Sequence, residues 1–165
     1  MQEYVMGNGA IALGALAAGV NLVAGYPGTP SSEIVETISR YPHEGVHLEW
    51  SVNEKAAMEV AAGAAYSGAR ALVTMKQVGL NVAADPLFPA AYNGVSGGFV
   101  VVTADDPSMH SSQNEQDSRF YGDFSLIPMY EPSNQQEAYD MVYNGFNFSE
   151  QTGEPILMRM VTRLA

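Results

Sequence analysis

Apolar and polar positions divide this chain into short apolar runs and longer stretches rich in small residues. Short runs of valine, leucine and methionine are typical of buried strands, whereas alanine-rich runs without β-branched clusters are typical of helices. The pattern predicts strands at residues 21–25, 45–50, 71–75, 98–104 and 155–162. It predicts helices at about 9–18, 31–40, from 54 onward, near 80–84 and at about 134–150. A polar segment at 105–123 and a short apolar stretch at 126–130 lie between the last two predicted strands.

Strands and helices therefore follow one another along the chain. This alternation is the signature of a parallel sheet covered by helices on both faces. We expect one three-layer α/β domain over residues 1–165, with a mostly parallel sheet of about six strands. Ligands bind beyond the carboxyl ends of the strands in such a sheet. The segments expected there are rich in glycine, proline and hydrogen-bonding side chains: 26–32, 50–54, 76–81 and 104–114.

The composition narrows the class of function. With 47% hydrophobic and 15% charged residues, the chain has the composition of a folded globular domain. Its 7 basic and 18 acidic residues give a net charge of -11, which repels nucleic acids and anionic membranes. No cysteine is present, which excludes disulfides and iron–sulfur clusters held by this chain and fits a cytoplasmic location. The three histidines lack metal-ligand spacing, so we expect no metal site.

Several common motifs are missing. The glycines at 7, 9 and 14 do not have the spacing of a dinucleotide-binding GxGxxG motif, and no GxxxxGK[ST] phosphate loop occurs. There is no GxSxG elbow, and His110 beside Ser111 is adjacency rather than catalytic geometry. The apolar run at 11–23 is interrupted by glycines and an asparagine and follows an acidic residue. It is neither a signal peptide nor a membrane span.

The segment 48–68, LEWSVNEKAAMEVAAGAAYSG, places Glu54 where a predicted strand gives way to an alanine-rich helix. The free N–H groups and the dipole at a helix N-terminus favour an anion by roughly 0.3–1 kcal/mol. Position alone leaves two interpretations open: the carboxylate supplies N-terminal helix charge, or it does chemistry at the edge of the sheet. Because alanine side chains are small, we expect another element to pack closely on this helix.

The segment 26–32, YPGTPSS, places a proline on either side of a threonine and precedes a predicted helix. Prolines fix the backbone, and a helix N-terminus attracts anions, so the arrangement suits a carboxylate ligand. A strand-to-helix turn with a capping hydroxyl is the alternative interpretation.

The segment NEKAAMEVAAGAAYSGARALVTMKQVGLN resembles the pyrimidine-binding domain of thiamine-diphosphate enzymes. Those domains have an acidic residue that opens an alanine-rich helix, then SG or TG, a strand and a glycine loop. Four segments in order are together similar to the 2-oxoacid:ferredoxin oxidoreductases: GYPGTPSSEI, EWSVNEKAAMEVAAGA, VTMKQVGLNVAADPL and ADDPSMHSSQNEQDSR. Within that family, they most resemble the alpha subunit of the indolepyruvate branch. The resemblance covers essentially the whole chain.

The resemblance implies a role for each segment. Glu54 would be the catalytic glutamate that hydrogen-bonds N1′ of the cofactor's aminopyrimidine and so promotes loss of the proton from thiazolium C2. Gly28 stands where the pyruvate branch carries a larger residue and would leave room for an aryl group. The cofactor would be bound by Gly28, Glu54, Lys76, Gln77, Gly79 and Asn81. The substrate would be bound by Thr29, His110, Ser111 and Gln113.

One departure from the family concerns the substrate carboxylate. The pyruvate branch has an arginine near the 104–114 loop that pairs with this group, whereas the present chain has Asp105 and Asp106 there. Two acids cannot replace an arginine. The resemblance therefore leaves the recognition of the carboxylate unassigned.

The resemblance also implies that this chain is half of a site, because it lacks the GDG…N segment that holds magnesium and diphosphate. Thiamine diphosphate would be shared with a diphosphate-binding domain, while Mg²⁺, iron–sulfur clusters and coenzyme A would lie on partner domains or on a beta- or gamma-type subunit. Homodimer pairing is expected. The complete enzyme would oxidatively decarboxylate aryl 2-oxo acids such as indolepyruvate to acyl-coenzyme A and reduce ferredoxin. The isolated domain would be inactive.

Two other functions stay open. The small subunit of a sulfopyruvate or phosphonopyruvate decarboxylase uses the same cofactor without electron transfer and has a similar length. A non-catalytic α/β binding or assembly module would keep the fold, and it would bury Glu54 by contacts within the chain.

Overall fold

A computed structural model describes residues 4–165. Its strands form one sheet in the order β2-β1-β3-β4-β6-β5, and every neighbouring pair is parallel. The strands are β1 (Leu22–Gly25), β2 (His47–Trp50), β3 (Ala71–Lys76), β4 (Phe99–Asp105), β5 (Met129–Tyr130) and β6 (Ile156–Val161). The predicted parallel sheet of about six strands is confirmed.

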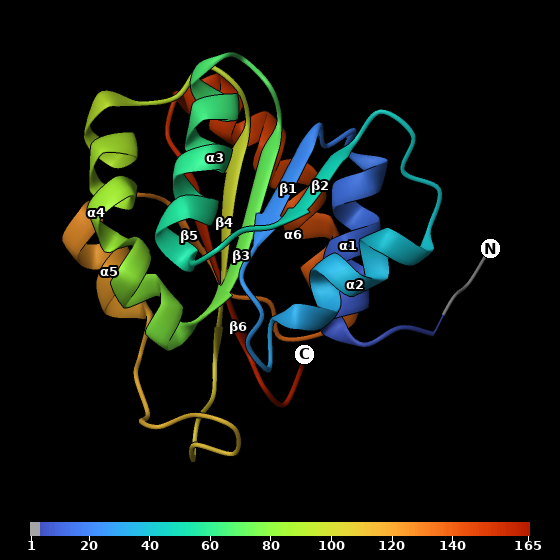
Figure 1. Ribbon diagram of the computed structural model, residues 1–165, viewed down its shortest axis with the longest axis vertical. Helices are drawn as coiled ribbons and strands as arrows, with labels where there is room; N and C mark the ends of the chain where they lie inside the picture. The colour runs from blue at the N-terminus through green and yellow to red at the C-terminus, as the bar shows by residue number, and fades with distance from the viewer. Residues whose placement is uncertain (1–3) are drawn as a thin grey trace.

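Helices cover both faces of this sheet, as Figure 1 shows. They are α1 (Gly7–Ala17), α2 (Ser32–Arg40), α3 (Glu54–Tyr66), α4 (Gln77–Asn93), α5 (Arg119–Ser125) and α6 (Gln135–Thr152). Successive residues of a strand face opposite sides, so Leu72 packs in the core under α1, α2 and α6, and Val73 packs in the core under α3 and α4. This arrangement confirms the three-layer prediction. None of the helices within residues 4–165 is long and apolar enough to cross a membrane.

The region around α4 and α5 differs from the prediction. The helix predicted near 80–84 is longer than expected, because α4 begins at Gln77, directly after β3, and runs for 17 residues. It contains Pro86 and Pro89. Proline lacks an N–H group and normally ends or kinks a helix, so the sequence predicted only a short helical stretch. Packing of α4 against α3 and the sheet overrides that local preference.

The same side of the sheet contains a second difference. The segment predicted as polar contains most of α5, and the apolar stretch that follows contributes only the two-residue strand β5. A seven-residue helix with Phe120 and Phe124 exposed has too little periodicity to be found by pattern.

Helix α3 begins at Glu54, as predicted. The side chain of Asn53 accepts a hydrogen bond from the Ala56 N–H at 2.9 Å and caps the helix. Ala57, Ala61 and other small residues are buried on the face that packs on the sheet and α4. The cap and this packing fix Glu54 just beyond the end of β2.

Candidate functional site

The carboxyl ends of β1, β2, β3 and β4 meet at one edge of the sheet, the lower edge in Figure 1. Each strand is followed there by one of the four predicted segments, 26–32, 50–54, 76–81 and 104–114. The prediction that these segments share one edge is confirmed. They supply every residue that the sequence nominated for the site.

Glu54 lies against Gly79, the third residue of α4. A Cβ atom on Gly79 would lie 2.6 Å from both Cγ and Oε1 of Glu54, closer than real Cβ contacts allow. Within residues 4–165, the half-buried Glu54 carboxylate has no hydrogen bond or ion pair. The glycine thus makes room for a carboxylate that is free to bind a ligand.

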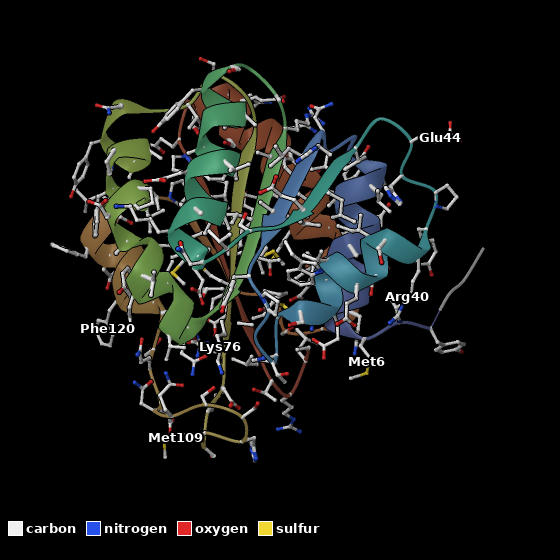
Figure 2. The ribbon with its side chains drawn as sticks, in the orientation of Figure 1. Met6, Arg40, Glu44, Lys76, Met109 and Phe120 are labelled. Atoms are coloured by element: carbon white, nitrogen blue, oxygen red, sulfur yellow. The ribbon has the colours of Figure 1, made fainter. Side chains whose placement is uncertain are left out.

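Gly28 makes a similar close approach, but to Lys76. A Cβ atom on Gly28 would lie 2.9 Å from Cδ of Lys76, so the lysine stem fills the space that the glycine leaves. The space that we expected to accommodate an aryl group is therefore occupied by the Lys76 side chain. Lys76 Nζ donates a hydrogen bond to the Ser111 carbonyl at 2.9 Å. Figure 2 shows Lys76 above the loop that carries Met109.

The turn after β1 is held by its own serines. The Ser31 hydroxyl donates to the Gly28 carbonyl, and the Gly28 N–H donates to the Ser32 hydroxyl, both at 2.8 Å. Thr29 is exposed, and its hydroxyl has no partner among the described residues. It lines a cavity of about 700 Å³ that also includes Asn8, whose amide donates to the Pro30 carbonyl at 2.6 Å. The turn thus leaves the Thr29 hydroxyl available for a ligand.

Gln77 and Asn81 lie on the first turns of α4 but differ in environment. Gln77 is fully buried, and its amide nitrogen donates to the Asn114 carbonyl at 3.3 Å. Its Oε1 atom has no partner within residues 4–165, although buried polar atoms are normally paired. Asn81 is exposed and accepts a hydrogen bond from the Tyr121 hydroxyl at 2.5 Å. Of these two amides, therefore, only Gln77 offers a buried acceptor that is unused.

The loop after β4 is fixed by Asp106. Its carboxylate accepts hydrogen bonds from the Ser111 N–H at 2.7 Å and from the hydroxyls of Ser112 and Thr162 at 2.9 and 2.8 Å. Burial opposes ionisation of Asp106, but these hydrogen bonds outweigh it and hold its pKa at about 2. The side chains of His110 and Gln113 stay exposed, without hydrogen bonds in the described part of the chain.

Asp105 is also structural. It is fully buried and accepts hydrogen bonds from the Ser118 N–H at 3.0 Å and from Arg159 Nε at 2.6 Å. The acids found in place of the family arginine therefore face the interior. No local pattern signals this role, because the charged partner Arg159 lies 54 residues further along the chain.

Within residues 4–165, the Glu54 carboxylate and the buried Gln77 amide oxygen have no partner at the carboxyl edge of an all-parallel sheet. These features define a class of α/β domains that bind polar ligands at that edge. The four ordered sequence segments and the Glu54–Gly79 contact narrow this class further. The chain belongs to the family described as pyruvate flavodoxin/ferredoxin oxidoreductase, thiamine-diphosphate-binding, whose model matches residues 13–161.

Curated relatives agree with this family. The chain is 54% identical to the indolepyruvate oxidoreductase subunit IorA of Archaeoglobus fulgidus, covering 98% of this chain and 27% of the relative. It is 51% identical to IorA of Pyrococcus abyssi, covering 96% of this chain and 25% of the relative. It is 31% identical to the 2-oxoglutarate synthase subunit KorA of Methanothermobacter thermautotrophicus, with coverages of 95% and 44%. The chain thus spans about a quarter of the length of the IorA relatives.

The fold also matches a solved structure. It superposes on a chain of the 2-oxoglutarate:ferredoxin oxidoreductase from Magnetococcus marinus, solved with 2-oxoglutarate, coenzyme A and succinyl-CoA bound, with a TM-score of 0.86. The identity is 22%, and the match covers 98% of this chain and 29% of the other. At that identity, the comparison establishes the fold.

Proposed function

We propose that this domain is the pyrimidine-binding half of a thiamine-diphosphate enzyme that oxidatively decarboxylates aryl 2-oxo acids, such as indolepyruvate, to acyl-coenzyme A and reduces ferredoxin. The proposal for the substrate rests on the names of the IorA relatives, which are indolepyruvate oxidoreductase subunits. The more distant KorA relatives are named as 2-oxoglutarate synthase subunits. Both groups of relatives are thus named after a 2-oxo acid.

One observation carries the proposal. The Glu54 carboxylate lies against Gly79, which has no Cβ atom, and it has no polar partner within residues 4–165. The residues fit the pyrimidine end of the cofactor, because within residues 4–165 Glu54 has an unpartnered carboxylate and Gln77, on the same edge, has a buried, unpartnered acceptor. Bound thiamine diphosphate would supply a nucleophilic carbon for addition to the 2-oxo carbon of the substrate. Glu54 would hold a proton at N1′ of the aminopyrimidine.

The other residues would position cofactor and substrate. Gln77 Oε1 would accept a hydrogen bond from an N–H of the aminopyrimidine, and Gly79 would make room for the Glu54 carboxylate beside that ring. Gly28, Lys76 and Asn81 would complete the cofactor cleft. Thr29 would contact the substrate, together with the exposed segment His110, Ser111 and Gln113.

The remaining parts of the reaction would belong to partners. A diphosphate-binding domain with Mg²⁺, an iron–sulfur domain, and the site for coenzyme A would lie on the same longer chain or on a beta- or gamma-type subunit. Ferredoxin would accept the electrons, and two copies of the domain would pair. We therefore expect the isolated domain to be inactive.

Turnover by the assembled enzyme tests this proposal. With indolepyruvate and coenzyme A, we expect reduction of a viologen dye together with formation of acyl-coenzyme A, and we expect Glu54→Gln to abolish both. The matched control is Glu59→Gln, an exposed acid on the same helix. Release of an aldehyde from sulfopyruvate or phosphonopyruvate, without dye reduction, would instead identify the decarboxylase alternative.

The non-catalytic alternative predicted that contacts within the chain would bury Glu54. The side chain is only half-buried and has no polar partner among residues 4–165. That environment favours a ligand-binding role. Failure of the assembled protein to bind thiamine diphosphate would restore the alternative.

A further inference from the structure

Most basic residues of this acidic chain are paired with a carboxylate, but two are not paired within residues 4–165. Five of its 7 lysines and arginines contact a carboxylate within 4 Å. The pairs are Arg40–Glu36, Lys55–Asp85, Arg70–Glu150, Arg119–Asp117 and Arg159–Asp105. The other two, Lys76 and Arg163, have no carboxylate partner within residues 4–165. Lys76 ends β3 and Arg163 follows β6, so both lie at the carboxyl edge of the sheet with the candidate site.

Arg163 lines a cavity of about 430 Å³ together with Pro107, His110, Val161 and Thr162. The cavity therefore lies between the loop after β4 and the end of β6. Thr162 also lines the larger cavity that contains Thr29, so one residue forms a wall of both. A ligand in contact with Thr29 would thus have Arg163 in the adjoining cavity.

The backbone around Arg163 is held in place on both sides. The Thr162 N–H donates to the Asp105 carbonyl at 3.0 Å. The Leu164 carbonyl accepts a hydrogen bond from the Gly7 N–H at 2.8 Å, and the Leu164 N–H donates to the Val161 carbonyl at 2.9 Å. The Arg163 side chain is exposed, but it projects from a fixed segment.

The nearby acids do not use this guanidinium. Asp106 directs its oxygens to Ser111, Ser112 and Thr162, and Asp105 is paired with Arg159. In a chain of net charge -11, a cation left without an acid beside a cavity is suited to an anion from outside. A planar guanidinium matches a carboxylate particularly well, because it can donate two parallel hydrogen bonds.

We propose that Arg163 recognises the carboxylate of the substrate in the cavity between the loop 107–114 and the end of β6. The proposal rests on the proposed function for the identity of the ligand as a 2-oxo acid. In this proposal the end of β6 recognises the substrate carboxylate. The loop after β4 does not, because its acids, Asp105 and Asp106, face the interior.

Chemical modification tests the contact without turnover. Butanedione modifies accessible arginines, and peptide mass mapping of the full-length protein in its complex reports the rate at each position. We expect Arg163 to react and phenylpyruvate to protect it, whereas phenylacetone, which lacks the carboxylate, should not. Arg119, exposed but paired with Asp117, is the internal reference. Equal rates at Arg163 with and without phenylpyruvate would overturn the proposal.

Steady-state kinetics of the assembled enzyme supply the second test. Loss of one charge-assisted contact predicts a KM for the 2-oxo acid that is about 10- to 100-fold higher in Arg163→Gln, with a much smaller change in kcat. Arg163→Lys should restore part of the affinity, because it keeps the charge but loses the paired donors. Arg119→Gln, which removes the same charge elsewhere, should leave KM unchanged.

The two tests separate the two proposals. If the wild-type enzyme oxidises aryl 2-oxo acids and Arg163→Gln has the wild-type KM, the role of Arg163 is refuted and the proposed function stands. If the wild-type enzyme does not oxidise these acids, the proposed function fails, and protection by phenylpyruvate still decides whether Arg163 binds a carboxylate.

Discussion

At the scale of single residues, the site depends on side chains that are missing as much as on those that are present. Gly79 lacks the Cβ that would meet the Glu54 carboxylate, and Gly28 lacks the Cβ that would meet the Lys76 stem. Each glycine therefore makes room for one charged side chain. The sequence showed that these glycines lie in site segments, but it could not show which side chain fills each space, because Lys76 reaches Gly28 only across the sheet.

Replacement of Gly79 by alanine tests this relation. The new Cβ would lie 2.6 Å from Glu54 Oε1 and would displace the carboxylate. We expect activity of the assembled enzyme to fall roughly 10- to 100-fold, because catalytic groups tolerate little displacement. Thermal unfolding should change little, since the half-buried Glu54 side chain can move and alanine favours a helix.

Gly63→Ala is the matched control, because a Cβ atom on Gly63, in α3, would meet nothing within 4 Å. That substitution should stabilise the helix by about 0.4–1 kcal/mol and leave activity unchanged. Full activity in Gly79→Ala would contradict the assigned role of the glycine.

At the scale of elements, the pattern of the chain predicted the sheet and most of its helices. It did so because buried parallel strands and amphipathic or alanine-rich helices have different periods. It failed where local preference and packing disagree, as in α4 with its two internal prolines, and where an element is very short, as in α5. It also missed the role of Asp106, whose partner Thr162 lies 56 residues away.

Asp106 links β4, the following loop and the end of β6, so its replacement by asparagine should affect that whole unit. The folded-state pKa of about 2 lies below the value of 3.8 that is usual for aspartate. Because the pKa is lowered in the folded state, the ionised carboxylate stabilises the fold by about 2 kcal/mol at pH values above the unfolded-state pKa. This stabilisation is lost as the pH falls through the folded-state pKa.

We therefore expect Asp106→Asn to be less stable than wild type by about 2 kcal/mol at pH 7. The difference should begin to shrink below about pH 5 and should continue to shrink towards about pH 2. Urea unfolding of the full-length protein at a series of pH values measures it. Asp123→Asn, at an exposed acid without a hydrogen bond among residues 4–165, is the control. A difference that does not vary with pH would show that the ionised carboxylate does not hold the loop.

At the scale of the whole molecule, the domain presents an open edge of its sheet with several unsatisfied groups. Glu54, Gln77 Oε1, the Thr29 hydroxyl and Arg163 all lie in segments at that edge and have ligand-binding capacity that residues 4–165 do not use. The chain also spans only about a quarter of its IorA relatives. Under the proposed function, these groups would bind cofactor and substrate together with other parts of a larger enzyme.

The central claim is that Glu54 activates the pyrimidine end of thiamine diphosphate. Hydrogen–deuterium exchange at C2 of the bound cofactor, followed by NMR after rapid quenching of the assembled enzyme, measures this activation directly. Loss of the proton-transfer role predicts exchange at least about 100-fold slower in Glu54→Gln than in wild type, with Glu59→Gln unchanged. Exchange in Glu54→Gln at the wild-type rate, with cofactor bound, would contradict the claim.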